Sequence, residues 1–141
     1  MKLKIKKVKK GARLPKYVHK NDAGMDLFSA ESFVLNPGER KVCLTGIAMA
    51  IPTGYVGLIW DKSGVAAKGG IKTMGGVIDS NYRGEIGIIL KNLSDNKYKI
   101  SKGDKIAQML IQKVASPEIE EVDDLENTDR GEGGFGSTGI R

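Results

Sequence analysis

The sequence has a single cysteine, Cys43, and a single histidine, His19, among its 141 residues. One cysteine cannot form a disulfide within the chain, and the two residues are too few for a Cys/His zinc cage. Apolar residues never run for the roughly 18 positions that a membrane-spanning helix needs. Lysines crowd the start of the chain but no apolar segment follows them, so no secretory signal is expected. These absences predict a cytoplasmic protein with no membrane contact.

Helical periodicity is also weak, whereas glycine is abundant, with 19 residues. Frequent glycines favour tight turns between short strands over long helices. The apolar runs between turn signals predict strands at residues 2–9, 32–35, 40–44, 47–51, 55–60, 85–92, 97–100 and 105–114. One short helix is expected near residues 63–68. In a chain of single-domain length, this pattern predicts an all-β sandwich or barrel.

Charge is distributed unevenly along the chain, whose 23 basic and 17 acidic side chains give a net charge of +6. Lysines occupy positions 2, 4, 6, 7, 9 and 10. Such a cluster is compatible with nucleic-acid binding. However, Leu3, Ile5 and Val8 interleave with the lysines, as in an edge strand with one solvated face, and no aromatic ring accompanies them to stack on bases. The pattern favours the solvated strand, so no nucleic-acid partner is expected.

The segment Met74–Ile86 carries the clearest candidate for catalysis, the carboxylate of Asp79. Two apolar residues precede this aspartate, and the loop after it ends in Tyr82–Gly84. Gly75 and Gly76 permit another molecule to approach the backbone closely. The segment is predicted to be a hairpin with an acid at its tip and an aromatic ring three residues later. The alternative is a surface hairpin whose aspartate is merely solvated.

Three further places carry polar groups in an apolar or strand-end context. Asp26 lies in a short apolar stretch, where a carboxylate needs a partner, a nearby backbone donor or a site to face. Lys62–Gly64 follows a strand and precedes the expected helix, so that N–H groups, a hydroxyl and an ammonium can converge on an anion. The alternative there is an ordinary Ser63 N-cap. Gln108 interrupts an apolar run and is expected to face outward from a strand.

The composition changes after Ser116, so the predicted core covers residues 1–116. Residues 117–129 form an acidic, extended arm, and residues 130–141 form a glycine-rich tail. The tail matches most of the Walker-loop pattern, with Gly131, Gly136 and Thr138 at the expected spacing. However, Ser137 occupies the position of the Walker lysine and no helix can follow, so a Walker site is rejected. A flexible tail that closes on phosphate remains physically sensible, and a disordered terminus is the alternative.

Five stretches stand in an order known from one family: Ala23–Leu27, Lys62–Gly64, Gly76–Gly84, Gly103–Gln108 and Arg130–Gly139. Through them the chain closely resembles the trimeric dUTP pyrophosphatase (dUTPase) family over essentially its whole length. The resemblance implies a jelly-roll-like β-barrel or sandwich with one short helix, assembled as a homotrimer with three active sites at the subunit interfaces. The acidic arm would then carry the tail onto a neighbouring subunit's site.

The resemblance also implies a role for each site residue. Asp79 would orient and deprotonate the water that attacks the α-phosphorus, and Tyr82 would pack beneath the deoxyribose and exclude a 2′-hydroxyl. The resemblance implies that the uracil is contacted by the backbone of Gly76, Val77 and Ile78 and is covered by the ring of Phe135. It implies that the phosphates are contacted by Lys62, Ser63, Gly64 and Gln108. In the tail, Arg130, Gly136, Ser137 and Thr138 would close on the phosphate end.

The implied reaction is the hydrolysis of dUTP to dUMP and pyrophosphate. Mg²⁺ on the triphosphate is implied as the cofactor, held mostly by phosphates and water, with Asp26 supporting it indirectly through water. The chemistry is sound because phosphoryl transfer needs positioning and charge neutralisation more than a strong base.

Two positions depart from the family pattern. Lys62 stands where the family usually has Arg, which keeps the charge but loses the planar bidentate fork. Thr73 stands where some members use Asn to help bind uracil.

Other functions are possible on the same fold. A dCTP deaminase, alone or bifunctional, would need a carboxylate that acts as general acid and base at C4 of the base. No such glutamate stands beside the uracil-reading backbone, although Glu85 is near in sequence. A non-catalytic nucleotide sensor is a further alternative, which the intact Asp79 and tail disfavour.

Overall fold

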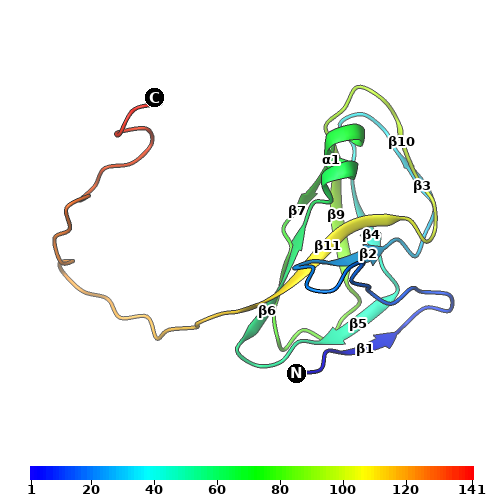
Figure 1. Ribbon diagram of the computed structural model, residues 1–141, viewed down its shortest axis with the longest axis horizontal. Coiled ribbons are helices and arrows are strands. Elements are labelled where there is room, and N and C mark those ends of the chain that lie inside the picture. Colours follow the sequence, from blue (N-terminus) through cyan, green and yellow to red (C-terminus); the bar gives the residue numbers. More distant parts are fainter.

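The computed structural model describes all 141 residues and contains eleven strands and one short helix (Figure 1). The elements are β1 Lys4–Lys7, β2 Met25–Phe28, β3 Phe33–Leu35, β4 Arg40–Leu44, β5 Ile47–Ala50, β6 Tyr55–Trp60, α1 Ser63–Gly69, β7 Ile71–Met74, β8 Val77–Ile78, β9 Gly87–Asn92, β10 Tyr98–Ile100 and β11 Lys105–Lys113. The prediction of an all-β chain with one short helix near residues 63–68 is confirmed, and the predicted strands agree with the observed ones to within two residues at each end.

The strands form four small antiparallel sheets. The largest has the order β2-β11-β6-β8, the next has the order β4-β9-β7, and two further pairs are β1-β5 and β3-β10. No two strands that are consecutive in sequence pair with each other. Each turn therefore carries the chain from one sheet to another, and the sheets wrap around one core.

All four sheets contribute residues to the core, including Leu35 and Ile100 of the β3-β10 pair. Seventeen buried apolar residues form a single cluster. Along β9 the side chains alternate, so that Ile88, Leu90 and Asn92 are buried while their neighbours are half-buried. This alternation follows from the two-residue period of a strand with one face on the core.

The prediction of a hairpin around Asp79 is wrong. Strand β8 pairs with β6, whereas β9 pairs with β4 and β7. The segment between Asp79 and Ile86 is therefore a crossover between two sheets. Turn-forming residues report only that the chain reverses locally, and they do not say which strand the next segment will meet.

Strands β2 and β7 were not predicted, and β2 shows a physical reason for the omission. All four of its residues, Met25–Phe28, are buried, so the stretch shows no alternation of apolar and polar residues. The lysine-rich N-terminus agrees with the predicted solvated strand, because Lys4, Lys6 and Lys7 are exposed in β1 while Ile5 packs against the core.

The chain leaves the core after β11. Residues 114–141 contain no strand or helix, and almost all of them are exposed. In Figure 1 this segment, coloured from yellow-orange to red, runs away from the sheets and does not return to them. No helix of the protein is long and apolar enough to cross a membrane.

Asn92 is the most fully satisfied buried polar side chain. Its Nδ2 donates to the carbonyls of Leu35, at 2.9 Å, and Asn96, at 2.8 Å. Its Oδ1 accepts from the N–H and the hydroxyl of Ser94 at 2.9 and 2.8 Å. The side chain thus joins β3, β9 and the loop that leads to β10.

Replacement of this side chain by an apolar one of similar size tests that role. Asn92→Leu removes the donor to the Leu35 carbonyl and the acceptor of the Ser94 N–H, and we expect a loss of about 2–4 kcal/mol in the free energy of unfolding. Denaturant titration measures it. The exposed neighbour gives the control, since Asn96→Ala should change stability by less than about 0.5 kcal/mol. Equal denaturant concentrations at the unfolding midpoint of the two variants would contradict a stabilising role for the Asn92 side chain.

Candidate active site

Asp79 lies at the start of a tight turn that directly follows β8. Its carbonyl accepts the N–H of Tyr82 at 3.1 Å. The guanidinium of Arg83 donates to the carbonyls of Ser80, at 2.7 Å, and Tyr82, at 2.9 Å. These bonds close the turn on itself, so the Asp79 carboxylate and the Tyr82 ring are held on a rigid segment.

The turn borders two hollows. Asp79 and Tyr82 line a small one of about 150 Å³ together with Val77, Ile78 and Gly87. On its other side Asp79 borders a larger one of about 600 Å³, which residues 53–56 of the β5–β6 corner help to line. The carboxylate is exposed, so it can reach a molecule in either hollow.

Gly76 lines a third hollow of about 190 Å³ together with Trp60, Thr73 and Val77. Its φ of +97° is in the left-handed region, and a Cβ on it would lie 2.9 Å from the carbonyl oxygen of Ile59. Only glycine fits there without strain. The N–H of Ile59 donates to the Gly76 carbonyl at 2.8 Å, which leaves that carbonyl committed inside the sheet.

The predicted alternative of a Ser63 N-cap is wrong. Lys62 occupies the N-cap position of α1, and no side chain caps the helix. Ser63 is the first helical residue, and both Ser63 and Gly64 are exposed. The first N–H groups of the helix therefore have no side-chain acceptor within the chain.

Asp26 has the partner that its apolar context required. Its side chain is only 3% exposed, and Lys62 donates to one carboxylate oxygen. The ammonium of Lys105 lies 2.9 Å from the other oxygen, at ion-pair distance but without hydrogen-bond geometry. Burial acts to raise the pKa of Asp26, but the hydrogen bond from Lys62 and the positive charges of Lys62 and Lys105 outweigh it and hold the pKa below its usual value. One buried charge is thus compensated by two lysines.

Gln108 lies on β11, opposite Asp26 on one side and Trp60 on the other. Its Nε2 donates to the carbonyl of Asp61 at 2.8 Å. A Cβ on Gly24 would come within 2.3 Å of the Gln108 amide oxygen. The absence of a side chain at Gly24 therefore makes room for this amide.

Asp61 is a residue of this region that the sequence patterns did not single out. Its Oδ1 accepts from the N–H and hydroxyl of Thr73 at 2.6 and 2.8 Å, and its Oδ2 pairs with Lys72 at 2.7 Å. Burial acts to raise the pKa of Asp61, but its bonds to Lys72 and Thr73 hold it below the usual value. The carboxylate fastens β7 to the end of β6. In the sequence, only the position of Asp61 directly after an apolar strand could have indicated that it has a role in this region.

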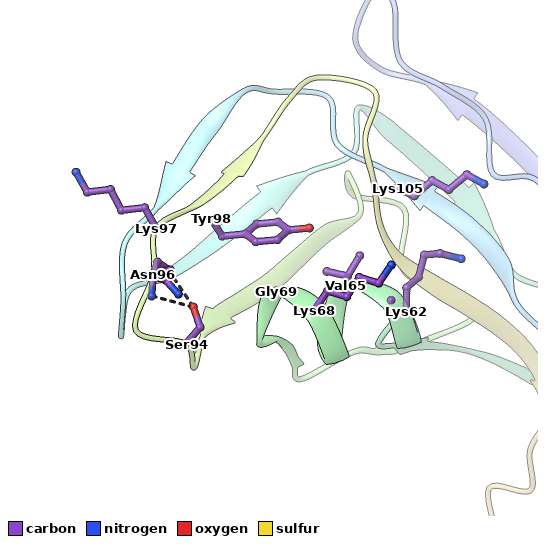
Figure 2. A pocket seen from close by; sticks show the side chains of 10 residues that line it. Lys62, Val65, Lys68, Gly69, Ser94, Asn96, Lys97, Tyr98 and Lys105 are labelled. Carbon is purple, nitrogen blue, oxygen red and sulfur yellow. Dashed lines mark hydrogen bonds between the residues drawn. The ribbon is translucent and has the colours of Figure 1, made fainter.

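A cationic hollow of about 520 Å³ lies beside α1 (Figure 2). Lys62, Lys68 and Lys105 are among the residues that line it, and no acidic side chain is. In Figure 2 the Tyr98 ring lies over the helix near Gly69, and the Lys97 side chain points away from the helix. The positive charge of this region therefore surrounds the start of α1.

The structure divides the predicted site residues into three groups. Asp79, Tyr82 and the backbone of residues 76–78 lie together, and Lys62, Ser63, Gly64 and Gln108 lie with Asp26 at the other end of β6. Strand β6 pairs with β8 at Gly57 and Leu58, and it ends at Trp60, three residues before Ser63. At about 3.3 Å per extended residue, the path from Gly57 to Ser63 spans at most about 20 Å. Residues 130–138 of the tail are apart from both groups in the same chain.

No group of three or more His, Cys, Asp or Glu side chains gathers to hold a metal ion. The buried carboxylate nearest the cationic hollow, Asp26, already faces two lysines. The residues present therefore fit Mg²⁺ only as an ion whose ligands are mainly phosphate and water, which Mg²⁺ accepts because it dehydrates reluctantly.

A family model described as dUTPase matches residues 10–139 of this chain. The deoxyuridine 5'-triphosphate nucleotidohydrolase of Clostridium tetani is 50% identical over 139 residues, which cover 97% of this chain and 96% of the relative. The protein of the same name from Trichodesmium erythraeum is 50% identical over 141 residues, with 99% of each chain covered.

Solved structures of dUTPases are also similar to this chain. The dUTPase of Staphylococcus bacteriophage 80alpha with dUPNHPP has a TM-score of 0.94 at 39% identity, with 99% of each chain covered. A variant dUTPase from phage phi11 of S. aureus, whose structure details the coordination of a structural Mg(II) ion, has a TM-score of 0.85 at 35% identity and covers 90% of this chain and 100% of its own. Since sequence and fold agree over nearly the whole length, this chain belongs to the dUTPase family and has its jelly-roll β fold.

Proposed function

We propose that this protein hydrolyses dUTP to dUMP and pyrophosphate. The observation that carries the proposal is the exposed carboxylate of Asp79, which shares a hollow with the Tyr82 ring on a turn closed by Arg83. Membership of the dUTPase family and the name of the relatives supply the substrate class.

Asp79 acts as the general base in this proposal. A water lies between its carboxylate and the α-phosphorus, and Asp79 takes a proton as the water oxygen attacks. The bond between the α-phosphorus and the oxygen that bridges to the β-phosphate breaks, and pyrophosphate leaves with that oxygen. Proximity and charge neutralisation supply most of the rate enhancement.

The base is selected by the backbone of residues 76–78, and the sugar by Tyr82. The Gly76 carbonyl is committed to Ile59, so the remaining backbone groups of this segment read the uracil edge. The Thr73 hydroxyl is committed to Asp61, which supports selection of the base without that side chain. The Tyr82 ring closes the hollow and excludes a 2′-hydroxyl.

Ser63, Gly64 and Gln108 bind the phosphates, with Lys62 supplying charge. The Gln108 amide is held by Asp61, and the uncapped start of α1 leaves N–H donors free for an anion. Lys62 and Lys105 outnumber the Asp26 charge that they share, so the cluster remains positive toward the triphosphate.

Mg²⁺ accompanies the triphosphate and neutralises its charge when bound. Phosphate oxygens and water would hold most of the ion, and Asp26, whose two oxygens face Lys62 and Lys105, would support it only indirectly through water. This assignment agrees with the lack of any cluster of metal-ligating side chains.

We also propose a homotrimer whose sites are shared between subunits. The hollow that Asp79 shares with Tyr82 is not lined by Lys62, Ser63, Gly64 or Gln108 of the same chain, and residues 130–141 leave their own core. A complete site then combines residues 1–116 of two chains with the tail of a third, which the acidic arm at 117–129 delivers. Phe135 stacks over the uracil, while Arg130, Gly136, Ser137 and Thr138 close on the phosphates.

A deaminase is the less favoured candidate. Glu85, the glutamate closest in sequence to the base-reading backbone, accepts the N–H of Gly46 at 2.8 Å and pairs with Lys9 at 3.2 Å. One carboxylate oxygen, Oε1, is therefore bound at the corner between β4 and β5, which disfavours a role for Glu85 in proton transfer at a base. An assay with dUTP and with dCTP, both with Mg²⁺, distinguishes the two reactions. Pyrophosphate from dUTP alone supports the proposal, and ammonia from dCTP overturns it.

Asp79→Asn tests the general base. The amide is nearly isosteric but cannot accept the proton, so kcat for dUTP should fall about a hundredfold or more while nucleotide affinity persists. Pyrophosphate release and calorimetric titration with a non-hydrolysable analogue measure the two quantities. The matched control is Asp95→Asn, an exposed aspartate in the turn before β10, which should leave kcat unchanged. Normal turnover by the Asp79 variant would remove it from the mechanism.

Deletion of residues 130–141 tests the tail. The core ends earlier, so light scattering should still report a trimer, whereas kcat should fall about a hundredfold because the triphosphate is no longer aligned.

A complementation experiment asks whether the tail acts on another subunit. The tail-deleted protein and Asp79→Asn protein are mixed, unfolded and refolded together. If sites are shared, mixed trimers contain sites with an intact Asp79 and an intact tail from different chains, and activity returns. Activity no higher than the sum of the two parents would count against shared sites.

The Asp26 cluster predicts a pH dependence of stability. The pKa of Asp26 is lower in the folded chain, so its charge stabilises the fold above the unfolded pKa of about 3.9, and this contribution is lost as the pH falls through the folded pKa. At pH 7, Asp26→Asn should lose about 2–3 kcal/mol of unfolding free energy, a discounted figure because both lysines are partly exposed. The difference between wild type and variant should shrink below about pH 4. A difference that stays constant down to pH 2.5 would show that the carboxylate charge is not what matters.

A further inference from the structure

The Tyr82 ring is held from two directions. Its hydroxyl donates to the carbonyl of Glu85 at 2.9 Å. A Cβ on Gly84 would lie 2.3 Å from that hydroxyl oxygen and 2.5 Å from the adjacent ring carbon. The ring therefore curls over Gly84, and the turn from Tyr82 to Glu85 closes around the space that a side chain at position 84 would fill.

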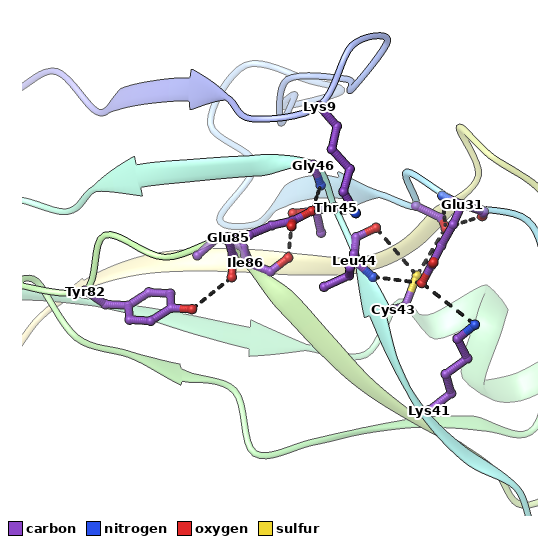
Figure 3. A network of polar contacts seen from close by, with 11 residues as sticks. Lys9, Glu31, Lys41, Cys43, Leu44, Thr45, Gly46, Tyr82, Glu85 and Ile86 are labelled. Atoms are coloured by element: carbon purple, nitrogen blue, oxygen red, sulfur yellow. Dashed lines mark hydrogen bonds and ion pairs between the residues drawn. The ribbon is translucent and has the colours of Figure 1, made fainter.

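Glu85 is itself fixed to the corner between β4 and β5 (Figure 3). Its carboxylate accepts the N–H of Gly46 at 2.8 Å and pairs with Lys9 at 3.2 Å. The next residue continues the attachment, because the carbonyl of Ile86 accepts from the N–H and hydroxyl of Thr45 at 3.1 and 2.7 Å. The crossover that carries Tyr82 is thus anchored just beyond the ring.

The corner that receives Glu85 is rigid. Gly46 has a φ of +70°, and a Cβ on it would lie 2.8 Å from the Cβ of Ala12. Its carbonyl accepts the N–H groups of Val8, at 2.8 Å, and Lys9, at 3.2 Å. The lysine-rich start of the chain therefore packs against the same glycine that binds the Glu85 carboxylate.

We propose that Gly84 and Glu85 are positioning residues for Tyr82 and so set the discrimination between deoxyribose and ribose nucleotides. This inference rests on the proposed function. The ring excludes a 2′-hydroxyl only while it stays where it is, since steric exclusion disappears once the excluding group can swing away. Neither residue touches the nucleotide. Gly84 acts by leaving room for the ring, because it has no side chain. Glu85 acts through its carbonyl, which accepts the Tyr82 hydroxyl, and through its carboxylate, which fixes that carbonyl to the corner at Gly46.

The test compares kcat/KM for dUTP with kcat/KM for UTP. In Glu85→Ala and Gly84→Ala, the dUTP/UTP ratio should fall by about ten- to a hundredfold, the scale of an ångström displacement of a positioning group. Most of this change should come from a higher kcat/KM for UTP. Tyr82→Ala, which removes the ring, gives the lower limit of the ratio.

Glu31→Ala is the matched control. Glu31 makes the same kind of anchor elsewhere on β4, where its carboxylate accepts the N–H of Leu44 at 3.2 Å and lies 4.0 Å from the ammonium of Lys41 (Figure 3). It does not contact Tyr82. Its loss should lower the melting temperature about as much as Glu85→Ala does and leave the sugar ratio unchanged.

The outcomes separate the inference from the function beneath it. If wild-type protein does not cleave dUTP, the proposed function fails. If Tyr82→Ala lowers the ratio but Gly84→Ala and Glu85→Ala do not, the positioning role is wrong and the function stands. An equal fall in Glu31→Ala would assign the effect to general loosening and would also overturn the inference. Should Glu85→Ala fail to fold, Gly84→Ala alone decides, because its backbone is not in the left-handed region and the atoms nearest to the added methyl all belong to the hydroxyl end of the Tyr82 side chain.

Discussion

Each hydrogen-bonded pair of strands in this protein joins two segments that are not consecutive in sequence. The chain must therefore change sheets at every turn, and the residues between two strands make no strand-to-strand hydrogen bonds in either sheet. Asp79 lies at the crossing from β8 to β9, and Lys62 and Ser63 lie at the crossing from β6 through α1 to β7. A side chain at such a place is supported by two sheets and yet faces solvent, which suits a group that must meet a substrate in a fixed position.

Charge compensation adds a second constraint. Asp26 is buried between β11 and the Lys16 bridge, so its carboxylate requires cations at fixed positions. Lys62 and Lys105 meet this need and thereby lie together at the rim of the cationic hollow. The family's usual arginine at position 62 would bring a planar fork, whereas the lysine here directs a single ammonium at one carboxylate oxygen. The same cation thus serves the interior of the fold and the region proposed for the triphosphate.

Local chemistry in the sequence predicted a good part of this structure. The helix at residues 63–69, the short strands and the exposed acid at Asp79 follow from turn residues, apolar spacing and glycine content, all of which are read within a few residues. What could not be predicted depends on distant partners. Lys105 as a partner of Asp26, the bond from Asp61 to Thr73 and the attachment of Glu85 to Gly46 each join segments that periodicity does not relate. Strand β2 was not predicted because a strand buried on both faces shows no alternation of apolar and polar residues. The predicted hairpin at Asp79 was wrong because turn-forming residues do not indicate which strand the following segment pairs with.

The central position of β11 also bears on how the molecule is made. This strand lies between β2 and β6 in the largest sheet, yet it is the last strand of the chain. During synthesis β2 and β6 emerge long before it, and until it arrives their inner edges have no partner. The main sheet can therefore close only when nearly the whole chain has left the ribosome, and closure must bring together segments separated by most of the chain's length. Such distant pairing slows folding and leaves strand edges open to other nascent chains in the meantime. Protein truncated before Lys105 would lack the strand that joins the two halves of the sheet, so incomplete chains should be recognised by chaperones and proteases instead of accumulating as partly folded subunits.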